Sequence, residues 1–107
     1  MELLEKNKKQ IAALCEQHDV ISLSLFGSLV KGTANQNSDV DLLVTFGDMD
    51  IHGYADNYYH FAVALENLLG RKVDLITEKS ITNPYLLKSI NRNRVTIYER
   101  GNPSMAA

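Results

Sequence analysis

Two aspartates, Asp39 and Asp41, stand at the start of the run VDLLVTF (residues 40–46), whose composition is typical of a buried β-strand. Alternate residues of a strand point to opposite faces, so both carboxylates share one face while Val40 and Leu42 share the other. A carboxylate taken out of water needs a compensating partner. The fold must therefore bury one face of this strand and offer the other a cation, backbone donors or solvent.

The chain length fits a single hydrophobic core. It has 107 residues, of which 45% are hydrophobic and 22% charged, and these ordinary globular values argue against disorder. We expect residues 1–100 to form one domain and residues 101–107 to form a flexible C-terminal tail. A chain this short has no room for a second, substrate-gripping domain, so we expect a partner to complete its working surface.

Charge and cysteine content narrow the function classes. A net charge of −2 creates no field that would attract polyanions, so we expect no strong nucleic-acid binding, although a small phosphorylated ligand remains compatible. The single cysteine, Cys15, cannot form an internal disulfide. No apolar run approaches the roughly 20 residues of a membrane span, and the first residues lack the apolar region of a signal peptide. We expect a cytoplasmic protein with no membrane partner.

Hydrophobic periodicity predicts alternating helices and strands. The expected helices cover residues 2–18, 54–69 and a segment beginning at Pro84, and the expected strands cover residues 20–26, 40–46, 72–77 and 94–99. Gly70 and Asn83 are placed as helix caps, with Thr82 as the alternative to Asn83. A short helix or turn through about residue 33, the polar loop 34–38 and the loop 47–53 fill the gaps. This order predicts an α/β (α+β) fold of two layers, in which helices pack on a mixed β-sheet of about four strands.

A set of polar residues recurs where the expected strands begin or end. Gly27 and Ser28 end the first strand, Asp39 and Asp41 follow after ten residues, and Asp74 lies within the third strand. Mg²⁺ prefers oxygen ligands and is usually held by one or two carboxylates plus phosphates, and a third carboxylate can support a second ion. Glycine permits close approach of the backbone to an anion, and a serine hydroxyl adds a donor.

Each of these features alone has an ordinary structural explanation. Gly-Ser after a strand is usually a turn, and an isolated aspartate is usually solvated. Only their coincidence at this spacing favours a metal and nucleotide site. The basic residues near the end of the chain are expected on a solvated face, with contact to an acidic partner or acceptor as the alternative: Lys88, Arg92, Arg94 and Arg100.

The segment 20–78 resembles the signature of the minimal nucleotidyltransferases of the DNA polymerase beta superfamily. The family pattern is Gly-Ser, ten residues, Asp-x-Asp and a further acidic residue on a later strand, and all of these are present. The resemblance implies a nucleotidyltransferase that uses two Mg²⁺ ions to move a nucleoside monophosphate, AMP from ATP, onto an acceptor hydroxyl. It implies that Asp39 and Asp41 are metal ligands and that Asp74 completes the second metal site or acts as the base.

The resemblance also implies a phosphate-binding segment, with one departure from the family pattern. Gly27 and Ser28 would hold the β- and γ-phosphates, with Lys31 beside them. The family often has Gly-Ser-Arg-Ala-Arg-Gly, whereas this chain has Leu29 and Lys31 at the two arginine positions. A lysine is a point charge without the two-pronged hydrogen bonding of a guanidinium, so a weaker phosphate grip follows.

Two functions remain open at this stage. Many small members of this family are antitoxins encoded beside a HEPN-type toxin, and some adenylylate a tyrosine of that partner. The resemblance therefore implies a HEPN-type partner protein as acceptor. The alternative is a catalytically weak nucleotide-binding module that neutralises its partner by binding. The sequence leaves the acceptor, the preferred base and a homo-oligomeric state open.

Overall fold

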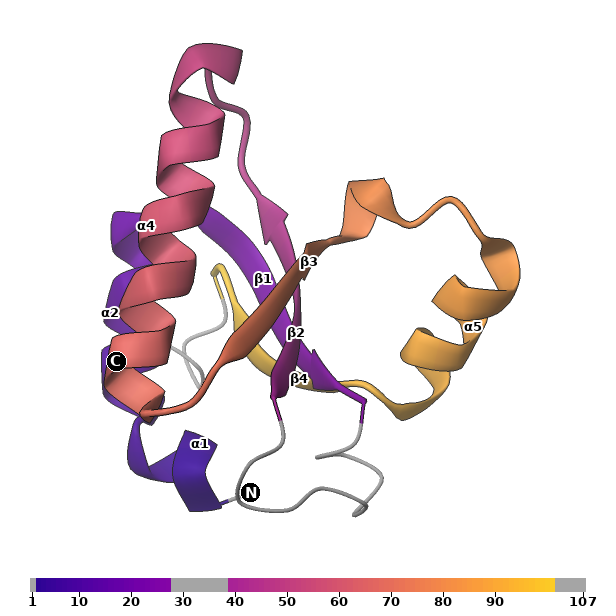
Figure 1. Ribbon diagram of the computed structural model, residues 1–107, viewed down its shortest axis with the longest axis horizontal. Coiled ribbons are helices and arrows are strands. Elements are labelled where there is room, and N and C mark those ends of the chain that lie inside the picture. Colours follow the sequence, from indigo (N-terminus) through magenta and orange to yellow (C-terminus); the bar gives the residue numbers. More distant parts are fainter. Residues whose placement is uncertain (1, 28–38, 102–107) are drawn as a thin grey trace.

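The computed structural model describes residues 2–27 and 39–101. Its elements, shown in Figure 1, are in chain order α1 (Glu2–Lys6), α2 (Lys8–Gln17), β1 (Val20–Phe26), β2 (Val40–Phe46), α4 (Ile51–Leu69), β3 (Val73–Thr77), the 3₁₀ turn η1 (Glu78–Ser80), α5 (Pro84–Asn93) and β4 (Val95–Glu99). The expected α+β fold is confirmed. Among the described ranges, no helix is long and apolar enough to cross a membrane.

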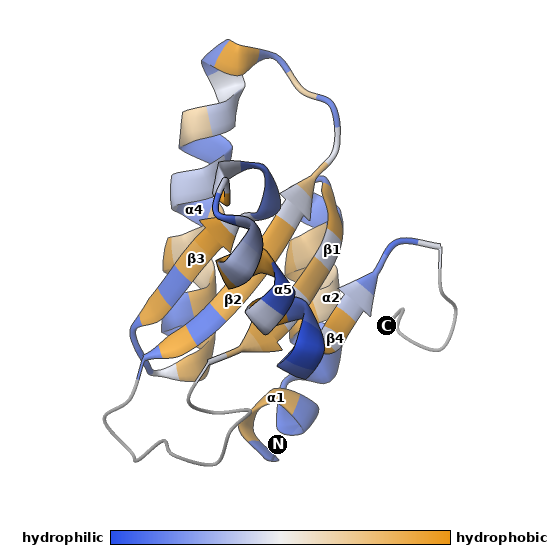
Figure 2. Cartoon of the chain, turned by 90° about the vertical axis from the view of Figure 1, so that its right-hand side faces the viewer, coloured by the Kyte–Doolittle hydropathy of each residue, from blue (hydrophilic) through white to orange (hydrophobic). Residues whose placement is uncertain are grey.

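The four strands form one mixed sheet in the order β3-β2-β1-β4. β1 runs antiparallel to both of its neighbours, whereas β2 and β3 are parallel. Helices α2 and α4 cover one face of the sheet, and α5 lies on the opposite side, in front of the strands in Figure 2. Among residues 2–27 and 39–101, two helices therefore cover one face of the sheet and α5 lies over the other.

The closed face carries the main core. Val40 and Leu42 of β2 are at most 1% exposed, and they share one hydrophobic cluster with Phe61 and Leu65 of α4. This cluster confirms that the even-numbered residues of β2 point inward. The intervening residues of β2, which include Asp41, consequently point to the second face, where α5 lies.

Two predicted helix boundaries were wrong, and each has a local cause. The helix expected over residues 2–18 is interrupted at Asn7, whose side-chain amide donates to the carbonyl of Leu3 at 2.9 Å. Helix α4 begins at Ile51 rather than at residue 54, because the Asp50 carboxylate caps it by accepting from the amide of His52 at 3.0 Å. Apolar spacing alone did not reveal this polar cap.

The predicted caps at the other helix ends are confirmed. Gly70 ends α4 in the left-handed conformation, with φ 66°. The Asn83 side chain accepts from the amides of Tyr85 and Leu86, and Pro84 occupies the first position of α5. Local cap chemistry therefore fixes these two boundaries without help from the tertiary fold.

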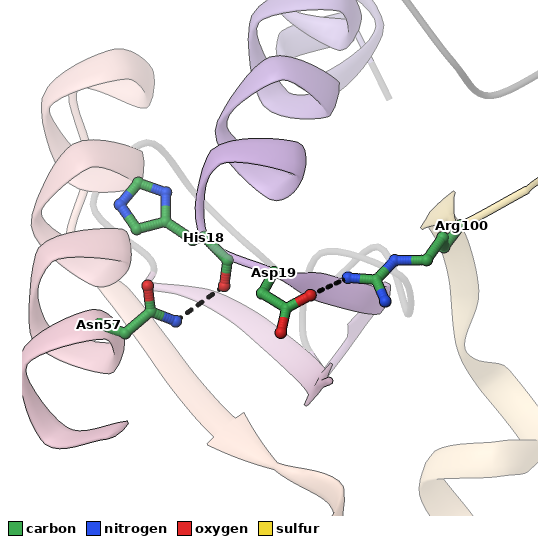
Figure 3. A network of polar contacts seen from close by, with 4 residues as sticks. All are labelled: His18, Asp19, Asn57 and Arg100. Atoms are coloured by element: carbon green, nitrogen blue, oxygen red, sulfur yellow. Dashed lines mark hydrogen bonds and ion pairs between the residues drawn. The ribbon is translucent and has the colours of Figure 1, made fainter. Parts of the chain in front are cut away.

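The turn from α2 into β1 is held from three sides, as Figure 3 shows in part. The Asn57 side chain of α4 donates to the carbonyl of His18 at 2.7 Å. The Asp19 carboxylate forms an ion pair with Arg100, just after β4. The Asp19 carbonyl accepts from the amide of Gly47, just after β2, at 2.8 Å. This corner ties the helical layer to the ends of two strands.

Cys15 lies at the centre of the helical layer. Its side chain is fully buried, and burial, aided by the charge of Glu16, raises the pKa of the thiol to about 12. The cysteine is therefore a protonated core residue and not a nucleophile.

Replacing Asn57 by alanine should destabilise the corner at His18. Asn67→Ala is the matched control, because Asn67 is exposed on the same helix and both changes gain the same helix propensity. The free energy of unfolding of Asn57→Ala should lie about 1 kcal/mol below that of Asn67→Ala, since one hydrogen bond to a part-buried carbonyl is lost. Urea unfolding measures the difference. Equal stabilities would show that the Asn57 bond contributes nothing.

Candidate active site

The pairing of β2 with β3 brings together the aspartates that the sequence singled out. In this parallel pair Asp41 lies directly opposite Asp74, and Asp39 precedes Asp41 by one strand repeat. Residues opposite each other in a sheet share a face, as do residues two apart on a strand. All three carboxylates therefore belong to the second face, near one end of the sheet.

The turn after β1 packs against the same site. Phe26 is the β1 partner of Asp41, and Gly27 follows it with φ 80°, in the region that favours glycine. A Cβ on Gly27 would stand 2.2 Å from Oδ2 of Asp41. A side chain at position 27 therefore fits only if the Asp41 carboxylate moves.

The carboxylates differ in their exposure. Asp39 and Asp74 are exposed, whereas Asp41 is half-buried. Within residues 2–27 and 39–101, no three His, Cys, Asp or Glu side chains form a ready-made metal centre. The strand register brings the three carboxylates to one face. Carboxylate oxygens are donors that Mg²⁺ prefers, so this donor set fits that ion.

The register also places a cation beside the carboxylates. Because Val40 pairs with Val73, Lys72 falls level with Asp39, and the Lys72 carbonyl accepts from the amide of Val40 at 2.9 Å. We did not single out Lys72 from the sequence. The available signal was its position two residues before Asp74, which places both side chains on one face of a strand.

Ser28 and Lys31, the other expected phosphate-binding residues, lie outside the described residues, as does Leu29. Their roles stay predictions. Of the expected phosphate-binding residues, Gly27 is the one that the structure describes.

Two nearby features lie apart from the carboxylates. Tyr58 of α4 donates its hydroxyl to the carbonyl of Leu75, and its pKa is raised mainly by burial and then by electrostatic interaction with Asp74 and Tyr54. A hollow of about 110 Å³ lies at the other end of β2 and β3, between Thr45, Phe46, Tyr54 and Glu78 among others. Asp39, Asp41 and Asp74 are not among the residues that line it, so it is not part of the candidate site.

A family model described as a nucleotidyltransferase domain matches residues 7–97. The chain belongs to this family. A chain of Methanocaldococcus jannaschii, whose name assigns it to the protein adenylyltransferases, is 40% identical over 96 residues, which cover 90% of this chain and 92% of the relative. The predicted membership among nucleotidyl-transferring enzymes is therefore confirmed.

Solved structures agree with this assignment. One described as a minimal nucleotidyltransferase is 31% identical, with a TM-score of 0.74 and coverage of 88% of this chain and 92% of the other. A toxin–antitoxin structure with AMP-PNP contains a chain that is 24% identical, with a TM-score of 0.68 and coverage of 89% and 75%. At that identity the second structure shows a shared fold.

Replacing Gly27 by alanine should impair the site more than the fold. The new Cβ would displace the Asp41 carboxylate, so we expect the rise in melting temperature produced by Mg²⁺ and ATP in the wild type to be lost. Gly70→Ala is the matched control, because Gly70 also has a positive φ but would meet nothing within 4 Å. Both variants should lose about 1–2 kcal/mol of stability from the left-handed backbone, with any residual clash at Gly27 adding to its loss.

Thermal unfolding with and without Mg²⁺ and ATP measures both effects. A Gly27→Ala variant that responds to the ligands as Gly70→Ala does would contradict the close approach of this glycine to a working carboxylate.

Proposed function

We propose that this chain is a Mg²⁺-dependent protein adenylyltransferase that transfers AMP from ATP to a hydroxyl group of a HEPN-type partner protein. The observation that carries the proposal is the alignment of Asp41 with Asp74 across β2 and β3, with Asp39 on the same exposed face. Three carboxylates in this arrangement suit phosphoryl-transfer chemistry better than a structural role, because like charges placed together destabilise an unliganded fold.

The reaction assigns a separate task to each carboxylate. Asp39 and Asp41 would hold Mg²⁺, which when bound neutralises the charge of the phosphates and orients them for in-line displacement. The acceptor oxygen bonds to the α-phosphorus, and the bond from that phosphorus to pyrophosphate breaks. The hydroxyl proton leaves to a base. Asp74 is the candidate for that base, and the alternative role for its carboxylate is to complete the second metal site.

The triphosphate would lie against the turn after β1. The positive φ of Gly27 and its lack of a side chain leave room for an anion close to the backbone. Ser28 would add a hydroxyl donor and Lys31 a point charge to the β- and γ-phosphates.

The partner is proposed from the relatives. The name of the similar Methanocaldococcus jannaschii chain supports a protein acceptor, and the fold shared with a toxin–antitoxin structure holding AMP-PNP supports a toxin partner and an adenine nucleotide. In this role the chain would act in the cytoplasm as an antitoxin that inactivates its partner covalently.

A second function is favoured by one sequence observation. Leu29 and Lys31 replace the two arginines common in the family, which weakens the expected grip on phosphate. The chain would then bind nucleotide with negligible turnover and neutralise its partner by association alone.

A labelling experiment separates the two functions. The pure protein is incubated with Mg²⁺, α-labelled ATP and the product of a neighbouring HEPN gene. We expect label on the partner. Mutating a residue that only hydrogen-bonds to a metal ligand typically lowers activity 10–100-fold, so Asp41→Asn, which changes a proposed ligand itself, should reduce the rate by more than that. Asp56→Asn, the same chemical change at an exposed position of α4, should leave the rate unaltered.

The other outcomes are equally informative. Tight association without label, in both the wild type and Asp41→Asn, would support the masking function. A ligand present at 100 times its dissociation constant stabilises a protein by about 2.7 kcal/mol. If Mg²⁺ and ATP do not raise the melting temperature of the wild type, the site assignment is wrong.

A further inference from the structure

A further charged residue, Arg94, lies level with the carboxylates on the second face. Leu25 of β1 pairs with Val95 of β4, and the next residue of β1, Phe26, pairs with Asp41. Because β1 and β4 are antiparallel, the backbone of Arg94 is level with Phe26 and hence with Asp41. Two strand spacings separate Arg94 from Asp41, a distance of about 10 Å.

The guanidinium of Arg94 is drawn along this face by Glu78. Nη1 of Arg94 lies 3.7 Å from Oε1 of Glu78, whose second oxygen accepts from the Thr45 hydroxyl at 3.0 Å. Thr45 shares the face of Asp41 because the two residues are four apart on β2. The ion pair therefore lies on the same face as the candidate site, and it holds the guanidinium towards the end of the sheet where Thr45 and Glu78 lie.

This ion pair is a loose one. Charge-assisted hydrogen bonds are usually 2.7–2.9 Å long, and 3.7 Å exceeds that range. The two side chains are 34% and 39% exposed, and exposed pairs contribute little stability. The pair also joins the two ends of the segment that connects β3 to β4, here called the η1–α5 excursion. Glu78 begins this segment, and Arg94 follows its last helical residue. Its weakness leaves Arg94 available to another anion.

We infer that Arg94 binds the β- or γ-phosphate of the nucleotide and exchanges Glu78 for that phosphate when the site is filled. This inference rests on the proposed function. A guanidinium offers paired donors that match phosphate, which the lysines in and near the site cannot do. The η1–α5 excursion would thereby be coupled to nucleotide occupancy through the same side chain.

Nucleotide affinity of paired variants tests the assignment. Titration calorimetry with Mg²⁺ and AMP-PNP should show about tenfold or greater weakening in Arg94→Ala and a smaller loss in Arg94→Lys. Glu78→Gln should bind as tightly as the wild type or more tightly, because it frees the guanidinium while still accepting from Thr45. AMP, which lacks both outer phosphates, should bind the wild type and Arg94→Ala equally.

Arg92→Ala is the matched control. It removes the same charge from the same segment. Arg92 follows the buried Ile90 by two residues, so it lies about 200° around α5 from the buried side of the helix, and it is exposed. Its affinity for AMP-PNP should equal that of the wild type. Urea unfolding of every variant shows whether each is folded before its affinity is compared.

Two results would overturn the inference. If Arg94→Ala and Glu78→Gln lose the same stability while both bind AMP-PNP like the wild type, the pair is only a structural clasp and the proposed function stands. If the wild type itself binds no AMP-PNP with Mg²⁺, the inference and the proposed nucleotide site fail together.

Discussion

The parallel register between β2 and β3 is the constraint on which the rest of the site depends. Val40 and Leu42 on β2, with their partners Val73 and Leu75 on β3, are buried in the core on one face. A slip of one residue would turn a strand over and send its aspartate into the apolar layer. Burial of the core thus enforces the alignment of Asp41 with Asp74, although neither carboxylate contributes to that burial.

Because the site lies at a sheet edge, placing three carboxylates close together costs less electrostatic free energy. β3 is an edge strand, and α2 and α4 lie behind the opposite face of the sheet. Asp39 and Asp74 therefore keep their solvent, and only Asp41 is half-buried, against Gly27. Arrangements that conflict with local stability are expected at functional sites, where a ligand later compensates the charge.

The two ends of the sheet are built differently. At the end where β1 begins, the side chains of Asn57 and Arg100 and the amide of Gly47 fix the corner at His18 and Asp19. At the other end, Asp39 and Asp74 are exposed and Asp41 is half-buried against Gly27. The candidate site therefore lies at the end of the sheet opposite this corner.

The sequence by itself determined the four strands, two helix caps, and the shared face of Asp39 and Asp41, because these depend on interactions between residues a few positions apart. The start of α4 at its Asp50 cap was missed because apolar spacing carries no information about it, whereas the Asn83 cap of α5 was predicted. Strand order, the alignment of Asp41 with Asp74, and the positions of Lys72 and Arg94 beside them were decided only by the tertiary structure. Strand pairing is non-local, and the packing of the whole core against α4 selects one register from several that the local sequence permits.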